Sequence, residues 1–189
     1  MGYESAVMSR SSDTKEGPAG GPVDGDAQAD LAERVGELAL GQGVKVAVAE
    51  SLTGGMISTA LATAGRSSEW FLGGLVAYAS EVKHDVLDVP DGPVVSAAAA
   101  SAMARGVRRL LKADIAVAAT GAGGPGGQDG REPGTVFLAF DGGDEHRVIR
   151  LDLDDEPEVV CATTAAAALR TLIEGLEVLA GERGIADRE

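Results

Sequence analysis

Two short segments without alternation of polar and apolar residues most constrain what this chain can fold into. Residues 44–49 read VKVAVA and residues 114–119 read DIAVAA. A strand with one face in water alternates polar and apolar residues, whereas a nearly continuous aliphatic run is typical of a strand covered on both faces. We therefore expect a β-sheet with helices packed on both of its sides.

Helical patterns and further strands alternate with these two segments along the chain. Gly41 ends the first helical pattern, Ser96 is a candidate N-cap, and Pro157 opens a final Ala-rich helix. The turn Asp141–Asp144 (DGGD) predicts a hairpin between the last two strands. This order indicates an α/β sandwich with a mixed β-sheet. The expected helices cover 31–39, 53–64, 81–87, 96–111 and 157–180, and the expected strands cover 44–49, 75–79, 114–119, 135–140 and 146–153.

Length and composition predict a single domain. The chain has 189 residues, 44% of them hydrophobic, which is enough for one core. Residues 1–28 are rich in Ser, Gly, Pro and Asp without apolar periodicity, and we expect them to be a disordered N-terminal tail. The domain is expected over residues 29–182, with a short C-terminal tail at 183–189.

The charge of the chain excludes some classes of partner. With 16 basic and 30 acidic residues, the formal net charge is −14, and a field of this sign repels nucleic acids and anionic membrane surfaces. A small anionic ligand stays possible, because a local cluster of amides or an arginine outweighs a distant charge. The single cysteine, Cys161, allows no internal disulfide and is expected to be a buried structural thiol.

We find neither a basic leader followed by an apolar segment nor an uninterrupted apolar run of membrane-spanning length. Together with the absence of a possible disulfide, this predicts a cytoplasmic protein with no membrane partner.

Three polar clusters follow predicted strands at the ends where open α/β sheets place their sites. They are Glu50–Gly55 (ESLTGG), Tyr78–Lys83 (YASEVK), and Thr120–Gly121 with the glycine-rich loop that extends to Pro133. Their common position is the main argument for a functional site.

The first cluster has two readings. Ser51 or Thr53 could accept a hydrogen bond from a free backbone N–H and cap the following helix. Alternatively, a hydroxyl at a helix N-terminus belongs to a site whose free amides stabilise an oxyanion or a phosphate. Gly54 and Gly55 would then allow a ligand to approach the backbone closely.

A serine nucleophile requires a base. The two histidines, His84 and His146, have no evident third partner for a Ser–His–Asp triad. Lys83 is the better candidate, because a desolvated lysine can lose its proton; the alternative is a solvated surface lysine. Tyr78, expected on the strand itself, could donate its hydroxyl to developing charge or only pack. Glu50 could pair with Lys83, orient an amide, or be an ordinary carboxylate at a strand end.

The third cluster resembles a dinucleotide fingerprint but lacks its context. Gly121–Gly126 matches G-x-G-x-x-G, and Asp141 lies at a suitable distance for a ribose contact. That fingerprint must open a helix, whereas prolines and a strand follow here, so we reject a Rossmann cofactor site. A backbone nest for a phosphate or carboxylate, helped by Arg131, and a mobile turn both stay open. No group of residues has metal-ligand spacing.

Taken together, the clusters resemble the C-terminal domain of the competence/damage-inducible CinA proteins and the stand-alone nicotinamide mononucleotide amidases. The matching segments are AESLTGG (49–55), FLGGLVAYASEVKHDVLDV (71–89), VVSAAAASAMARGV (94–107) and ATGAGGPGGQDGREPGTVF (119–137). The resemblance implies a three-layer α/β/α fold, a homo-oligomer (dimer or trimer), and deamidation of nicotinamide mononucleotide without a metal or organic cofactor.

The resemblance also implies roles for individual residues. Ser51 is the implied nucleophile, Lys83 its base, and Tyr78 and Thr120 active-site hydroxyls, while the loop from Gly121 to Arg131 would help to hold the nucleotide. Amides near Thr53, Gly54 and Gly55 would stabilise the tetrahedral oxyanion. The implied substrate-binding set is Glu50, Thr53, Gly54, Gly55, Thr120, Gly121, Gly124 and Arg131.

One segment departs from the family pattern. Many active amidases carry Gly-Asp-Arg and a further Arg before the last helix, where this chain reads DDEPEVV over residues 154–160. Arg131, Arg147 or Arg150 could replace those arginines. The departure leaves open an alternative function, in which a non-catalytic or altered-specificity family member binds a nucleotide or a protein partner on the same scaffold.

Overall fold

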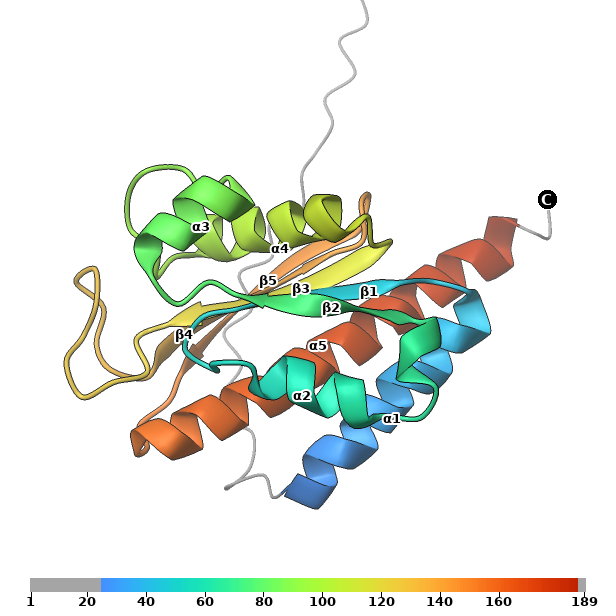
Figure 1. Cartoon of the computed structure of the whole chain (residues 1–189), viewed down its shortest axis with the longest axis horizontal. Coiled ribbons are helices and arrows are strands. Elements are labelled where there is room, and N and C mark those ends of the chain that lie inside the picture. The colour runs from blue at the N-terminus through green and yellow to red at the C-terminus, as the bar shows by residue number, and fades with distance from the viewer. Residues whose placement is uncertain (1–24, 187–189) are drawn as a thin grey trace, which may run out of the picture.

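A five-stranded mixed sheet in the order β2-β1-β3-β4-β5 forms the middle layer of the molecule. The computed structural model describes residues 25–186, with side chains to Gly181. Helices α3 and α4 cover one face of the sheet, and α1, α2 and α5 cover the other (Figure 1). The helices are α1 (Gly25–Gln42), α2 (Met56–Thr63), η1 (a 3-10 helix, Ser67–Glu69), α3 (Ser80–Leu87), α4 (Ala97–Leu111) and α5 (Pro157–Ala186); the strands are β1 (Val46–Glu50), β2 (Phe71–Val76), β3 (Ile115–Gly121), β4 (Thr135–Asp141) and β5 (His146–Asp152). The expected three-layer α/β/α sandwich with a mixed β-sheet is confirmed.

The direction of the strands brings three strand ends to one edge. Strand β1 pairs in parallel with β2 on one side and β3 on the other, with Glu50 opposite Val76 and Ala119. Strands β3, β4 and β5 run antiparallel, and the expected hairpin joins the last two. The carboxyl ends of β1, β2 and β3 therefore lie side by side.

Side chains of different size face the two helical layers. In the central strand, Val46 and Val48 point into the cluster shared with α1, α2 and α5, while Ala47 and Ala49 point toward α3 and α4. Strand β3 repeats this division with Ile115, Val117 and Ala119 on one side and Ala116 and Ala118 on the other. Both strands are completely buried, as their unbroken apolar sequences predicted. Alanine on the second face allows α4 to approach the sheet closely.

The last helix, α5, is a core element despite its length and composition. An 18-residue segment within residues 157–181 has a mean hydropathy of 1.4, so by length and composition this helix could cross a membrane. Arg170 and Glu174 divide it, so it is not an uninterrupted apolar run. Just over half of that segment, 56%, is buried inside the fold. Leu169, Leu172 and Leu176 all lie in the apolar cluster beneath the sheet. Burial within the domain explains the apolar composition of this helix.

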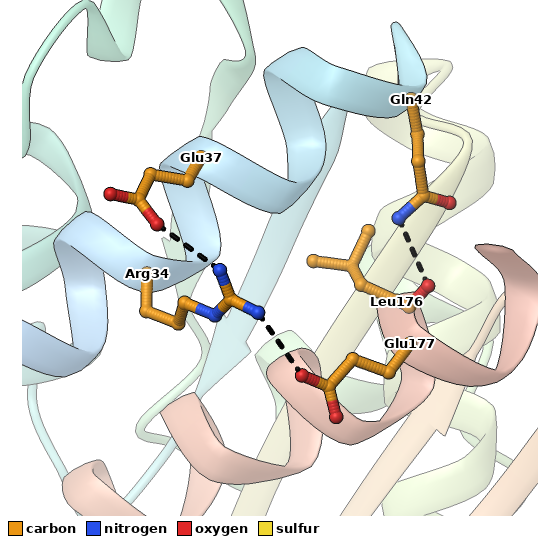
Figure 2. Close-up of polar contacts among 5 residues, drawn as sticks. All are labelled: Arg34, Glu37, Gln42, Leu176 and Glu177. Carbon is orange, nitrogen blue, oxygen red and sulfur yellow. Dashed lines mark hydrogen bonds and ion pairs between the residues drawn. The ribbon is translucent and has the colours of Figure 1, made fainter.

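Polar contacts fasten α1 to α5 beside this cluster (Figure 2). The Arg34 guanidinium bridges Glu37 on its own helix and Glu177 on α5, at 3.2 and 3.4 Å. The Gln42 amide donates to the Leu176 carbonyl at 2.9 Å. Exposed ion pairs of this kind contribute about 0–1 kcal/mol, so the buried apolar faces of the two helices hold them together.

Some element limits differ from the expectations. Strand β2 begins at Phe71 and ends at Val76, earlier than the expected 75–79. Gly73 and Gly74 concealed it, because glycine is unfavourable in strands; Gly74 is needed because the Ser58 side chain of α2 occupies the place of its Cβ. Helix α1 starts at Gly25, inside the expected tail, and α5 continues to Ala186. Residues 1–24 and 187–189 of the two predicted tails lie outside the described residues.

Gly175 marks the closest approach of α5 to the sheet and gives a test of this packing. A Cβ at this position would overlap the buried ring of Phe140 on β4. We expect Gly175→Ala to lower the free energy of unfolding by about 1–3 kcal/mol, because an overpacked core must shift backbone or side chains. Chemical denaturation measures the change.

Gly181→Ala is the matched control, because it lies on the same helix and nothing occupies the space around its Cβ position. Alanine should stabilise this variant by up to about 1 kcal/mol through helix propensity alone. Equal stability changes in the two variants would contradict the close packing of α5 on β4.

Candidate functional site

The three polar clusters meet at the carboxyl edge of the parallel strands. Glu50 is the last residue of β1 in register with β2 and β3, and the Ala77 amide donates to its carbonyl at 2.7 Å. Ser51 therefore lies beside Ala77 and Thr120. Ala49 faces α3 and α4, and continued alternation just beyond the strand end would place the Ser51 side chain on that same side. Ser51 is 7% exposed and Thr120 is 1% exposed.

Glu50 faces the opposite side and caps helix α2. Its carboxylate is fully buried and accepts hydrogen bonds from the backbone N–H groups of Gly55, Ile57 and Ser58 at 3.0, 3.1 and 2.8 Å. The hydroxyls of Thr53 and Ser58 also donate to it, at 2.7 and 2.5 Å. A carboxylate at a helix N-terminus gains from the helix dipole as well as from the amides. Of the roles left open for Glu50, it orients amides; it does not pair with Lys83.

This cap corrects the assignments made for the turn after β1. Neither Ser51 nor Thr53 caps α2; Thr53, 3% exposed, is a donor to Glu50. Gly54 and Gly55 have φ of +58° and +107°, a left-handed conformation that explains the two glycines. Their amides donate to the Ser51 carbonyl and to Glu50, so they are not available for an oxyanion.

The remaining donors in this turn are the backbone N–H groups of Leu52 and Thr53. Within the described part of the chain, neither makes a hydrogen bond. They flank Ser51 on its C-terminal side. These two amides replace those of Gly54 and Gly55 as candidate oxyanion donors.

Lys83 is a buried lysine in α3 and not a surface residue. It is 1% exposed, and its ammonium donates to the Tyr78 carbonyl at 3.0 Å, next to the strand ends. Burial lowers the pKa of the Lys83 ammonium, while the carboxylates of Asp129 and then Glu81 raise it. A lysine whose hydrogen bond goes to a neutral carbonyl is suited to exchange a proton.

Tyr78 differs from its expected position. It lies two residues beyond the end of β2 rather than on the strand, and its side chain is 73% exposed. Its backbone carbonyl, not its hydroxyl, contacts Lys83. The expectation failed because Gly73 and Gly74 are unfavourable in a strand, so the strand was predicted to begin after them, at residue 75.

The glycine-rich loop is a hairpin closed by Asp129 and Gly130. Gln128 and Arg131 exchange backbone hydrogen bonds at 3.2 and 2.8 Å, and the two residues between them have φ of +53° and +71°. Such a conformation belongs to the tight type I′ turn that Asp-Gly favours. The sequence signal for this turn is the pair Asp129-Gly130 itself.

Asp129 anchors this hairpin to the site and is the residue that sequence reasoning missed. Its carboxylate accepts from the amides of Val94 and Val95 at 2.6 and 2.9 Å. The Thr120 hydroxyl donates to the Val94 carbonyl at 2.8 Å. Asp129 also lies near enough to Lys83 to raise its pKa. The hairpin is thus held against the segment before α4, which argues against a freely mobile turn.

The glycines of the hairpin differ in their surroundings. Gly121 is buried at the end of β3, and a Cβ there would meet the Thr135 carbonyl at 2.8 Å. Gly123 packs on the Leu52 side chain. The backbone carbonyl of Leu52 accepts a hydrogen bond from the Cys161 thiol at 3.1 Å. Gly124 is exposed, with nothing within 4 Å of its Cβ position. The start of the hairpin therefore lies against the turn that carries Ser51.

Cys161 is half-buried rather than fully buried as expected, and its thiol donates to the Leu52 carbonyl. It begins the second turn of α5, and burial raises the pKa of its thiol. A raised pKa reduces the thiolate population that a nucleophile or a metal ligand requires. Among the described residues, no three His, Cys, Asp or Glu side chains are grouped closely enough to hold a metal ion.

Two arginines lie over the ring of Phe137, the cross-strand neighbour of Thr120 on β4. The guanidinium carbons of Arg131 and Arg150 lie 5.7 and 5.9 Å from the ring centroid of Phe137. Phe137 pairs with Thr120 across β3 and β4, so both side chains face α4. Arg147 points to the other side of the sheet, where it pairs with Glu174 of α5 at 2.7 Å.

The chain is similar to a set of known proteins along most of its length. Residues 28–176 match the family described as CinA C-terminal domain. A CinA-like protein of Geotalea daltonii is 40% identical over 136 residues, which cover 69% of this chain and 33% of that protein. A CinA-like protein of a Synechococcus species is 49% identical over 105 residues, covering 52% of this chain and 25% of that protein. The chain thus spans about a third or less of these curated relatives.

Solved structures match over nearly their whole length. The crystal structure of a competence-damaged protein (CinA) superfamily protein from Klebsiella pneumoniae has a TM-score of 0.76 and 31% identity, with 79% of this chain and 98% of that chain covered. A CinA superfamily protein from Escherichia coli has the same TM-score at 28% identity, covering 82% and 92%.

Fold and site together define an α/β sandwich domain whose candidate site lies at the carboxyl ends of its parallel strands. With the family match and the similar structures, the chain belongs to the CinA C-terminal domain family.

The Glu50 cap predicts a selective loss of stability. In Glu50→Gln, the side chain keeps one acceptor but turns an NH₂ group toward donors that the carboxylate satisfied. We expect the free energy of unfolding to fall by about 1–3 kcal/mol, the cost of buried donors left without partners. Denaturant titration measures it.

Glu37→Gln is the control, because that carboxylate is 68% exposed and pairs only at the surface. Its effect should stay within about 0.5 kcal/mol. If both variants are equally stable, Glu50 does not organise the turn.

Proposed function

We propose that this domain hydrolyses the carboxamide of nicotinamide mononucleotide to nicotinic acid mononucleotide and ammonia, with Ser51 as nucleophile and Lys83 as base. The observation that carries the proposal is the buried Lys83, whose lowered pKa and neutral hydrogen-bond partner suit a proton acceptor. Membership of the CinA C-terminal domain family supports it.

The proposed reaction begins with Lys83 in its neutral form. Lys83 takes the Ser51 hydroxyl proton as Oγ attacks the carboxamide carbon, and the carbonyl oxygen becomes a tetrahedral oxyanion. The N–H groups of Leu52 and Thr53 are the proposed donors to that oxyanion. Lys83 then returns the proton to the departing nitrogen, which leaves as ammonia. Water, deprotonated by Lys83, hydrolyses the acyl-enzyme and restores Ser51.

The overall charge of the protein is compatible with this substrate. Its reactive end is a cationic pyridinium, which acidic surroundings favour, whereas its phosphate requires a local basic group to offset the net charge of −14. No metal or organic cofactor takes part in the proposed steps. A homo-oligomer, as dimer or trimer, and a cytoplasmic location complete the proposal; the single cysteine in 189 residues is consistent with the latter.

Ammonia release from nicotinamide mononucleotide tests the reaction and its two central residues. We expect turnover by the wild type and a loss of at least about 10³-fold in kcat for Ser51→Ala and for Lys83→Met, because the nucleophile and its base act as a unit. Lys83→Met retains an unbranched side chain of similar size in the buried position.

Ser68→Ala is the control, because this serine lies exposed in η1, away from the strand ends. Its activity should equal that of the wild type, and thermal unfolding should show that all variants are folded. Turnover that survives Ser51→Ala contradicts the mechanism. A folded wild type that releases no ammonia contradicts the reaction.

The charge of Asp129 predicts a shift in the pH dependence. Lys83 must be neutral to act as a base, so kcat/KM rises with pH through its pKa. The Asp129 carboxylate raises that pKa. In Asp129→Asn the charge is lost while an acceptor for Val94 and Val95 remains, so the rising limb should move to lower pH.

Glu81→Gln is a graded comparison, because Glu81 raises the same pKa less than Asp129 does. Its limb should move in the same direction by a smaller amount. A limb that stays in place, or moves to higher pH, in Asp129→Asn would show that Lys83 is not the titrating base.

A binding module on the same scaffold is the second candidate function. Asp154, Asp155, Glu156 and Glu158 are all exposed where the resemblance predicts arginines. Calorimetry with nicotinamide mononucleotide separates the two: saturable binding to the wild type without ammonia release favours a non-catalytic or altered-specificity member.

A further inference from the structure

We propose that Arg131 and Arg150, gathered on the ring of Phe137, form an anion subsite that binds the phosphate of the nucleotide substrate. This inference rests on the proposed function for the identity of the ligand. The subsite itself stands on contacts that do not involve Ser51 or Lys83.

Two guanidinium groups from separate elements converge on one ring. Arg131 comes from the hairpin after β3 and Arg150 from the edge strand β5, and their guanidinium carbons lie 5.7 and 5.9 Å from the Phe137 ring centroid. The ring is buried, with Phe137 only 6% exposed, so it is a fixed support. Guanidinium groups held against an aromatic face keep their N–H edges available for bidentate contacts with a phosphate.

The register of the sheet aligns this pair with the proposed nucleophile. Thr120, Phe137 and Arg150 are direct neighbours across β3, β4 and β5, and Ser51 follows Glu50, the partner of Ala119, just beyond the end of β1. Strands lie about 4.8 Å apart, so the backbone of Phe137 is about 10 Å from that of Ser51. The arginine pair therefore lies about two strand spacings from the turn that carries Ser51, within the length of a mononucleotide.

The charge balance at the ring favours an anion. In the described part of the chain, the Arg131 guanidinium makes no ion pair, and it lies over the Phe137 ring. Arg150 donates through Nε and Nη2 to one oxygen of Asp152, at 2.9 and 2.7 Å, which leaves its Nη1 group for a ligand. These three side chains carry one net positive charge at the surface of an acidic protein.

The third arginine left open by the sequence is excluded by its position. The side chains of Arg147 and Arg150 lie on opposite faces of the sheet. The Arg147 guanidinium is neutralised by Glu174 and Glu145, at 2.7 and 3.6 Å. It is engaged on the face of the sheet opposite to the ring of Phe137. Arg147 is therefore a matched control for the loss of a β5 arginine.

Turnover of two substrates tests the subsite. We expect Arg131→Gln and Arg150→Gln each to raise KM for nicotinamide mononucleotide about tenfold, and the double variant more, because each loses a charge-assisted contact. Nicotinamide riboside lacks the phosphate, and its kcat/KM should stay unchanged. Arg147→Gln should leave both substrates unaffected, and Arg150→Lys should recover part of the loss. An unchanged preference for the phosphorylated substrate in the double variant overturns the proposal.

Calorimetry with nicotinic acid mononucleotide keeps this test separate from the proposed reaction. If the wild type binds that ligand but releases no ammonia, and the double variant binds it at least tenfold more weakly, the subsite holds while the amidase proposal fails. If the wild type turns over nicotinamide mononucleotide and the double variant binds the ligand equally well, the subsite fails alone. A wild type that does not bind the ligand contradicts the subsite.

Discussion

The buried carboxylate of Glu50 is the interaction on which the site depends. It accepts five hydrogen bonds, three from backbone amides at the start of α2 and two from hydroxyls. These bonds close the turn between β1 and α2, which carries Ser51. Glu50 thus orients the turn that holds the proposed nucleophile.

The small residues of β1 and β3 determine which helical layer holds the chemistry. Valines fill the space toward α5, whereas alanines let α4 approach the sheet closely. Lys83, Thr120 and Phe137 all lie on this alanine side. Lys83 is buried in α3, which packs on α4, and this burial lowers its pKa.

Much of the fold was predictable because its signals are local. Unbroken aliphatic runs marked β1 and β3, and Ser96 does cap α4 by accepting the Ala99 amide at 3.1 Å. The errors have physical reasons. Gly73 and Gly74 hid the start of β2, because glycine is unfavourable in strands. Gly74 is required there by the Ser58 side chain of α2, a contact that the local sequence does not reveal. Asp129 was missed because its partners, Val94 and Val95, are distant in the sequence.

The sequence by itself determined the layers, the strand ends that carry polar residues, and the family pattern of ESLTGG and YASEVK. Periodicity and turn chemistry act within a few residues, so they can be read without coordinates. Only the tertiary structure decided that Glu50 turns inward, that Tyr78 is exposed, and that Arg131 and Arg150 share a ring while Arg147 does not. Those outcomes depend on which face of the sheet each side chain meets, and register between distant strands sets that face.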